Sequence, residues 1–550
     1  MTKKSLAVTL LAGTIALTSV LPSVAMAAPG EKDLVPLRTA AEAQGAKVTW
    51  HQKNQTIVIE RGADEIIVTV GEQQAEVNGK VTSLEGEPVV QAGKTYISLS
   101  TLNTLLSSQA EWNETEQTIH FASNDTAGNA SLFVHKLFSG NASQITSLMS
   151  ESLKASMPAD EIWTAIGQQY ALIAGKPIML QDAVVERNGV HTNVSMTYET
   201  TQIPLSITVR FDGNGYVDDL YIDAAVGNVP YVQPDYDKGN YSEEEVVIGE
   251  GSFAVPGTLT VPEGEGPFPV VVLVHGSGPH DRDSSISGTK VFKDIAAGLA
   301  AKNIAVLRYE KVTREHTFKV SAQPLFTLKN ESADDANRAI ELLQQREDID
   351  KDRIFVAGHS QGGFAMPLIL SNDTQDHIAG AILLSAPSST YMDAMLEQQE
   401  VVIGKMKELG LPSEMIAAQE QTEAMVQQIA VLLEDPAYSK DNMPQAFPMS
   451  PAYWWYEQRD YVPAEAMKDV EKPLLIMQGE NDWQVTMKQF EGWKTALEGH
   501  EQVTFTSYPN MNHLLTEYEG ISIGLEYATP ANVSSKLITD LADWILKFTE

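Results

Sequence analysis

The residues with the clearest chemical potential lie in the stretch Arg353–Gly363, where a short apolar run leads into Gly358-His359-Ser360-Gln361-Gly362. This G-x-S-x-G pattern, after a strand and before a helix, is typical of a nucleophile elbow, the sharp turn that exposes a serine hydroxyl. A serine hydroxyl is a weak nucleophile at neutral pH and needs a base beside it. The pentapeptide also occurs by chance in long chains, so Ser360 is a candidate nucleophile only if a base and an orienting acid are found elsewhere.

Two later apolar runs end in groups of the required types. Leu474–Met477 leads into Gln478-Gly479-Glu480-Asn481-Asp482, and Val503–Tyr508 leads into Pro509-Asn510-Met511-Asn512-His513. Serine, acid and histidine then follow one another along the chain, each just beyond a strand, which is the order of a triad built on a parallel sheet. The sequence therefore predicts Ser360 as nucleophile, His513 as base and Asp482 as the orienting acid, with Glu480 as the alternative acid.

A fourth strand supplies a candidate oxyanion site. Pro269–Val274 is a buried-strand pattern that ends in His275-Gly276-Ser277-Gly278. A loop at this place can turn a backbone N–H toward a developing negative charge. We therefore predict that the N–H groups of Ser277 and Gln361 form the oxyanion hole, and that His275 lies at the substrate pocket.

From about Glu243 to the C-terminus the chain resembles bacterial α/β-hydrolases of the esterase and prolyl-oligopeptidase-related kind. The elbow and the His513 segment carry the resemblance together with four further motifs: Val274-His275-Gly276-Ser277-Gly278-Pro279, Asp281-Arg282-Asp283, Leu307-Arg308-Tyr309-Glu310-Lys311 and Gln478-Gly479-x-x-Asp482. The resemblance implies an α/β-hydrolase fold for residues 243–550. The pattern of the residues agrees, because a hairpin at Glu245–Thr260 is followed by strands that alternate with helices, as a parallel sheet requires.

One insertion breaks this alternation. About eighty residues separate Ala386-Pro387 from Pro473, where the fold needs only a short connection. Tyr391–Leu409 and Met415–Leu433 have the periodicity of two long amphipathic helices, which predicts a helical lid at about 388–470. The adjacent aromatic residues Tyr453, Trp454 and Trp455 are predicted to line the substrate pocket, with core packing as the alternative.

The beginning of the chain has the pattern of a signal peptide over residues 1–27. Lys3-Lys4 precedes an apolar run from Leu6 to Leu21, and Ala25-Met26-Ala27 follows as a cleavage site. The protein is therefore expected to be secreted or held at the cell surface, with no membrane span once the signal is cleaved. The net charge of −35 argues against nucleic acid as a partner. The chain has no cysteine, so its stability comes from its cores alone.

Residues 33–123 contain an internal repeat with an offset of 62 residues. Val35-Pro36-Leu37 aligns with Ile97-Ser98-Leu99, and Gln55-Thr56-Ile57 aligns with Gln117-Thr118-Ile119. Each copy is predicted to form a strand, a helix and a hairpin, and the unit resembles the N-terminal domain of copper amine oxidases, which is used as a stalk in secreted bacterial proteins. His51 and His120 are isolated, so the sequence predicts no metal site there.

Residues 124–129 are rich in small polar residues and are predicted to be a linker. Helical patterns followed by four strands predict a small α+β domain at 130–226, which resembles the cone-shaped domain that precedes the hydrolase in some secreted bacterial esterases. The domain contains no candidate acid and base pair.

The residues and the resemblance together predict a secreted serine hydrolase, a carboxylesterase that cleaves small or medium acyl esters without metal or organic cofactor. The alternatives are a serine peptidase of the prolyl-oligopeptidase-related type and a surface- or wall-binding protein in which the hydrolase domain is accessory. In that last alternative the N-terminal repeat makes the contact with the cell surface. Prolyl-oligopeptidase-type enzymes carry a propeller of repeated blades at their N-terminus. The sequence shows a two-copy repeat of another kind there, which argues against the peptidase alternative.

Overall fold

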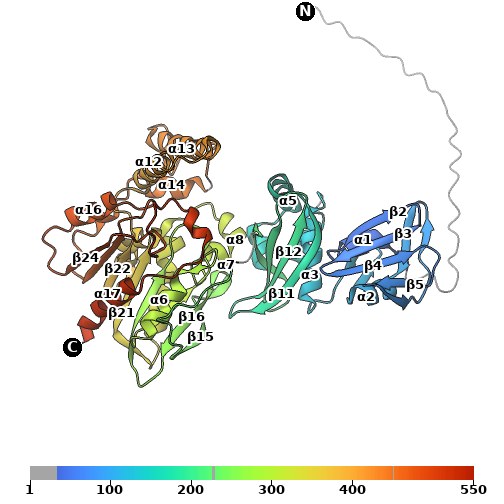
Figure 1. Cartoon of the computed structure of the whole chain (residues 1–550), viewed down its shortest axis with the longest axis horizontal. Coiled ribbons are helices and arrows are strands. Elements are labelled where there is room, and N and C mark those ends of the chain that lie inside the picture. The colour runs from blue at the N-terminus through green and yellow to red at the C-terminus, as the bar shows by residue number, and fades with distance from the viewer. Residues whose placement is uncertain (1–33, 141, 226–228, 450, 550) are drawn as a thin grey trace, which may run out of the picture.

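The computed structural model describes residues 34–140, 142–225, 229–449 and 451–549, so the predicted signal peptide lies outside the described residues. Figure 1 shows three domains in a row: a β-rich N-terminal domain, a small α+β middle domain and a large C-terminal domain. Within the described ranges, no helix has both the length and the apolar character that crossing a membrane requires.

The N-terminal domain contains the predicted strand, helix and hairpin in each copy of the repeat. The first copy forms β1 (Leu34–Pro36), α1 (Leu37–Glu42), β2 (Lys47–His51) and β3 (Thr56–Arg61), and the second forms β8 (Lys94–Ser98), α2 (Leu99–Leu106), β9 (Glu111–Asn113) and β10 (Thr118–His120). Strands β4 (Asp64–Thr69), β5 (Gln74–Val77), β6 (Lys80–Ser83) and β7 (Val89–Gln91) lie between them. β1 pairs antiparallel with β8, and Val35 lies opposite Ile97, its equivalent in the repeat. The two copies are therefore related by a local two-fold axis at this pair.

The middle domain packs helices on one face of an antiparallel meander. Its elements are α3 (Thr126–Phe138), α4 (Glu151–Ser156), α5 (Asp160–Ala174), β11 (Pro177–Arg187), β12 (Thr192–Thr200), β13 (Leu205–Phe211) and β14 (Val217–Ala224), with the strands paired in chain order. Alternate residues of β12, such as Val194 and Met196, are buried against Phe133 and Trp163 of the helices. This is the α+β arrangement that the sequence pattern predicts.

The prediction of a linker at 124–129 is wrong, because residues 126–129 form the first turn of α3 and Asp125 is its N-cap. The Asp125 carboxylate accepts a hydrogen bond from the N–H of Gly128 at 2.9 Å and caps the helix. A Cβ at Gly128 would lie 2.4 Å from the ring of Phe121, so the helix packs closely on the preceding strand. Small polar residues cap helices as readily as they form linkers, which explains the error. α3 contributes Leu132 to the N-terminal core and Phe133 to the middle core, so it joins both domains.

The C-terminal domain is built on a mixed sheet of eight strands. In spatial order these are β15 (Tyr241–Ile248), β16 (Val255–Pro262), β20 (Ala305–Tyr309), β17 (Phe268–Val274), β21 (Ile349–His359), β22 (Ile378–Leu384), β23 (Leu474–Gly479) and β24 (Val503–Tyr508). β15 and β16 form an antiparallel hairpin, and the strands from β20 to β24 are parallel, as predicted. The carboxyl ends of β17, β21, β23 and β24 therefore meet at one edge of the sheet.

Helices cover both faces of this sheet. Val270 and Val272 of β17 face a core that includes α9 (Asp334–Leu343), α11 (Met366–Asn372) and α16 (Met487–Ala496). Val271 and Leu273 face a second core, formed with α6 (Val291–Ala300) and α17 (Ser535–Leu546). The continuous apolar run of β17 is explained by this burial on both faces.

The insertion after β22 forms the two predicted helices, α12 (Tyr391–Glu408) and α13 (Ser413–Glu434), and a shorter helix, α14 (Ala452–Gln458). Figure 1 shows these helices together at one end of the sheet. An apolar cluster of α12, formed by Val402, Ile403 and Met406, packs against Trp483 and Ile523, which lie in the loops that follow β23 and β24. The insertion therefore contacts the loops that carry Asp482 and His513.

Candidate active site

Ser360 lies in the sharp turn between β21 and the short helix α10 (Gln361–Phe364). Its backbone has φ of 53°, a strained conformation for a residue other than glycine. A Cβ at Gly358 would lie 2.4 Å from the backbone of Gly362, and a Cβ at Gly362 would lie 2.3 Å from the carbonyl oxygen of Val274. Both glycines are therefore required by close packing of the backbone, and the turn projects the serine from the end of the strand.

His513 and Asp482 are in direct contact. The Nδ1 atom of His513 lies 2.7 Å from Oδ2 of Asp482, and both side chains are buried. The other oxygen of Asp482 accepts the N–H groups of Gln484 at 2.8 Å and Val485 at 2.9 Å. These bonds hold the carboxylate, which in turn fixes the proton on Nδ1 and leaves Nε2 available as a base. Glu480, the alternative acid, accepts a hydrogen bond from Ser507 instead.

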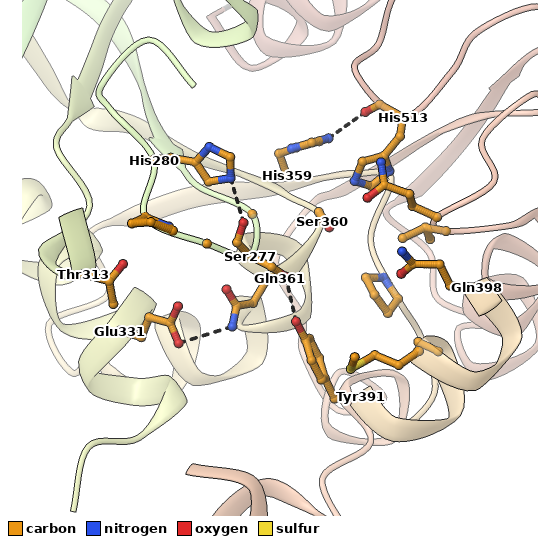
Figure 2. Close-up of a pocket in the computed structure, with 18 of the residues that line it drawn as sticks. Ser277, His280, Thr313, Glu331, His359, Ser360, Gln361, Tyr391, Gln398 and His513 are labelled. Atoms are coloured by element: carbon orange, nitrogen blue, oxygen red, sulfur yellow. Dashed lines mark hydrogen bonds between the residues drawn. The ribbon is translucent and has the colours of Figure 1, made fainter. Parts of the chain in front are cut away.

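A cavity of about 960 Å³ brings the predicted groups together. Ser360, Gln361, Ser277 and His513 all line it, and Figure 2 shows them around one opening. The hydroxyl of Ser277 lies 2.7 Å from the hydroxyl of Tyr391 at the start of α12. Burial raises the pKa of Tyr391 to about 12, so its phenol keeps its proton. The insertion thus contacts the loop that carries Ser277.

Two further histidines support the loops of the cavity. His359 donates from Nε2 to the backbone oxygen of His513 at 2.8 Å, and His280 donates from Nε2 to the backbone oxygen of Ser277 at 2.7 Å. Burial, with the neighbouring His513, lowers the pKa of His359 to about 3. Burial, with the charge of Lys311, lowers the pKa of His280 to about 4. Both rings are therefore neutral near pH 7 and act as hydrogen-bond donors to the backbone.

Only some of the predicted pocket residues lie at the cavity. Trp454 and Trp455 line the cavity, whereas Tyr453 and His275 are not part of its wall. His275 is buried behind it, donates from Nε2 to the backbone oxygen of Asp281 at 2.9 Å and packs on Phe292. The prediction that His275 and Tyr453 form the pocket is corrected accordingly. Neighbouring residues on a helix point about 100° apart, so adjacent aromatic residues of α14 cannot all face one cavity.

The sequence reasoning missed a further wall of the cavity. This wall is formed by residues of two short helices, α7 (Val312–Glu315) and α8 (Thr317–Ser321), and by one carboxylate, Glu331. The lining residues from the helices are Thr313, Thr317, Val320 and Ser321. Their only sequence signal is their position directly after the motif that ends in Lys311.

The same helices join the C-terminal domain to the middle domain through a buried cluster of charged groups. His191 lies between two carboxylates, with Nδ1 2.6 Å from Glu315 and Nε2 3.0 Å from Asp218. His191, Asp218 and His316 could in principle provide ligands to a metal, since their ligand atoms lie within 4.8 Å of one another. The ammonium of Lys319, however, lies 2.5 Å from Asp218 and already supplies the positive charge at this place. The cluster therefore acts as an ionic contact between domains.

This contact predicts a pH-dependent contribution to stability. Burial acts to lower the pKa of His191, but the bonds to Asp218 and Glu315 outweigh it, so the pKa is raised. The contribution of His191 to the free energy of unfolding is therefore complete at pH values below its pKa in the unfolded chain, about 6.5. This contribution is lost as the pH rises through its pKa in the folded protein. Replacing His191 by Gln should cost about 3–5 kcal/mol of unfolding free energy near pH 5.5, the scale for breaking a buried ion pair. The difference in unfolding free energy between this variant and wild type should shrink toward pH 9.

Unfolding measured between pH 5.5 and 9 tests this prediction, with His135→Gln as the matched control in the same domain. Burial lowers the pKa of His135, so the effect of its replacement should change with pH in the opposite direction. A cost for His191→Gln that stayed constant over this range would contradict the ionic role.

Two family models match separate regions of the chain, and one known protein matches most of its length. Residues 17–121 match the copper amine oxidase N-terminal domain, and residues 266–519 match the family described as serine aminopeptidase, S33. The esterase EstD of Thermotoga maritima is 31% identical over 427 residues, which are 76% of this chain and 95% of that protein.

Two solved esterases are similar at lower identity. The esterase of Pyrococcus furiosus is 14% identical, with 58% of this chain and 97% of that chain covered and a TM-score of 0.37. Est1E from Butyrivibrio proteoclasticus is 16% identical, with 56% of this chain and 99% of that chain covered and a TM-score of 0.36.

Proposed function

The chain belongs to the same α/β-hydrolase family as the esterase EstD, and from this membership we propose that it is a secreted carboxylesterase acting on small or medium acyl esters. The predicted α/β-hydrolase fold and the resemblance of the N-terminal region to copper amine oxidases are thereby confirmed. The observation that carries the proposal is the position of Ser360, His513 and the two candidate N–H donors around one cavity.

In the proposed reaction Ser360 attacks the ester carbonyl while Nε2 of His513 takes its proton. Asp482 holds the imidazole in the required tautomer and stabilises its positive charge. The N–H groups of Gln361 and Ser277 hold the oxyanion, the alcohol leaves with the proton from His513, and an acyl-enzyme remains. Water activated by the same histidine then releases the acid and restores the serine.

The lining of the cavity favours esters over peptides. Among the described residues its lining contains no lysine, arginine or aspartate, and the one carboxylate among them, that of Glu331, lies 2.7 Å from the ammonium of Lys311. An enzyme that selects the charged end of a peptide needs an unpaired group of opposite charge, which the described part of this wall does not provide. A neutral substrate matches it better.

The test is a panel of p-nitrophenyl esters of increasing chain length beside aminoacyl and peptidyl anilides. We expect turnover of the esters and at least a hundredfold lower specificity constants for the anilides. Faster cleavage of an anilide than of any ester would replace the esterase proposal with the peptidase alternative.

The proposed export rests on the sequence pattern of residues 1–27 and on the copper amine oxidase-like region that follows it. N-terminal sequencing of the protein recovered from a culture medium tests it. A new N-terminus at Ala28 is expected, and retention of the uncleaved protein inside the cell would refute export.

Trp455 is expected to bind the acyl chain. It lines the cavity beside Tyr391, with 5.9 Å between the ring centroids. Replacing it by Ala should remove apolar contact of about 1–3 kcal/mol from long acyl chains, which corresponds to about ten- to a hundredfold in kcat/KM for hexanoyl and longer esters. Acetyl esters should change little, since they do not reach this wall.

Tyr456→Ala is the matched control, because Tyr456 is buried on the same helix but does not line the cavity. Its replacement should lower the melting temperature and affect all esters equally. If Trp455→Ala also gave an equal loss at every chain length, its role would be packing rather than acyl binding.

A further inference from the structure

Lys311 is fully buried directly behind the oxyanion site. Its ammonium donates to the backbone oxygen of Gly276 at 2.7 Å and to the side-chain oxygen of Gln361 at 3.0 Å. Its third partner is the carboxylate of Glu331 at 2.7 Å. The side chain of Lys311 is only 2% exposed, so all three of its N–H groups are satisfied inside the protein.

The bond to Gly276 determines the direction of the Ser277 N–H. The two groups belong to one planar trans peptide, in which C=O and N–H point in opposite directions. Ser277 lines the cavity and Lys311 does not. Holding the carbonyl from behind therefore turns the N–H of Ser277 toward the cavity. The positive charge of the Lys311 ammonium, beside the carbonyl oxygen of Gly276, also polarises the peptide group. The N–H of Ser277 thereby becomes a stronger hydrogen-bond donor.

The second bond holds the other side of the oxyanion site. Gln361 supplies the second candidate N–H, and its side chain is bound by Lys311 through the oxygen and by Glu331 through the nitrogen at 3.3 Å. Glu331 also accepts the indole N–H of Trp454 at 2.9 Å, which connects the network to the insertion. It lies in a single π-helical turn, Lys329–Ala333, a distortion that is frequent at functional sites. Figure 2 shows Glu331 bonded to Gln361 at the edge of the cavity.

We propose that Lys311 is a positioning residue that sets the two N–H donors of the oxyanion hole, acting through Gly276 on one side and Gln361 on the other. Lys311 does not contact the substrate, because its ammonium is enclosed and lies outside the cavity wall. Its effect is therefore on the stability of the transition state and not on the binding of the ester. This inference rests on the proposed ester hydrolysis.

The first test is Lys311→Met, which keeps the length of the side chain and removes the ammonium. We expect kcat to fall about ten- to a hundredfold, less than for complete loss of an oxyanion donor, with KM within about threefold of wild type. The inhibition constant of a boronic acid, which forms a tetrahedral adduct with serine, should rise by the same factor as kcat falls. If Lys311 contributed only to packing, the fall in kcat and the rise in the inhibition constant would not be correlated.

Lys319→Met is the matched control. Lys319 is equally buried, but its ammonium bonds to Asp218 and to the backbone oxygen of Ser252, away from the cavity. The two variants should lose similar melting temperature, yet Lys319→Met should keep kcat within about threefold. If Lys311→Met folded and also kept kcat and boronic acid affinity within threefold, the proposal would be overturned.

A rescue experiment uses the absence of cysteine in the chain. Lys311→Cys can be alkylated with 2-bromoethylamine while unfolded, which forms one C–S bond, displaces bromide and leaves an ammonium at nearly the length of lysine. After refolding, the alkylated protein should recover at least half of the kcat of refolded wild type, and the unalkylated protein should not. Equal activity of both forms would refute the need for the charge.

Gln361→Ala covers the case in which Lys311→Met fails to fold. It removes only one acceptor of the ammonium and should lower kcat about three- to tenfold, and an unchanged kcat would count against the proposal. Amide hydrogen exchange of residues 275–280 separates the positioning role from the reaction itself. Exchange should accelerate at least tenfold in Lys311→Met and stay unchanged in Lys319→Met, whether or not an ester is the substrate.

Discussion

Replacement of Ser360 by alanine is expected to lower kcat/KM for p-nitrophenyl esters by about a thousandfold or more, because members of a triad act as one unit. The variant should fold, since the glycines on either side, and not the serine hydroxyl, permit the close packing of the turn. Labelling by a fluorophosphonate should be lost together with activity. Label on another serine, or activity that survives the change, would contradict the assignment of the nucleophile.

Ser385 offers a matched control for this substitution. It follows the neighbouring strand β22, has a φ of 48° and is fully buried, but it does not line the cavity. Ser385→Ala therefore removes a hydroxyl at the same edge of the sheet from a second residue with positive φ, and it leaves the backbone strain unchanged. Turnover within about threefold of wild type is expected, so that a loss in Ser360→Ala can be ascribed to chemistry.

The candidate triad could be predicted from the sequence because each member is marked by local features. Ser360, Asp482 and His513 each follow an apolar strand, and parallel strands place such residues at one edge of the sheet whatever the details of packing. The N-terminal repeat was predictable for a similar reason, since two equivalent copies have the same pattern of strand, helix and hairpin. Chain order and periodicity are sufficient for features of this kind.

The remaining parts of the site depend on contacts between residues that are distant in the sequence. His191 meets Glu315 across 124 positions, and Trp454 meets Glu331 across 123. No local pattern marks either pair. The choice between Tyr453 and Trp454 depends on the rotation of α14, which is determined by its neighbours and not by its own composition. Lys311 belongs to a motif that was visible in the sequence, but its partners were not.

Replacement of Asp482 by asparagine is expected to lower kcat by about ten-thousandfold, the loss known for this change in a serine triad. The shape of the side chain is kept, but an amide can present its N–H₂ to Nδ1 of His513. The imidazole then carries its proton on Nε2, where it cannot accept one from Ser360. KM should change by less than about threefold, because Asp482 is not part of the cavity wall.

Glu480→Gln decides between the two candidate acids, because Glu480 lies only two positions before Asp482, directly after the end of β23. Its carboxylate bonds to the hydroxyl of Ser507 at 2.8 Å, whereas His513 lies 2.7 Å from Asp482. Its replacement should leave kcat within about threefold, since neither the cavity nor the imidazole is touched. Both substitutions remove one negative charge from the same loop, so a general electrostatic effect would lower kcat in both. If Glu480→Gln lost more activity than Asp482→Asn, the acid of the triad would have to be reassigned.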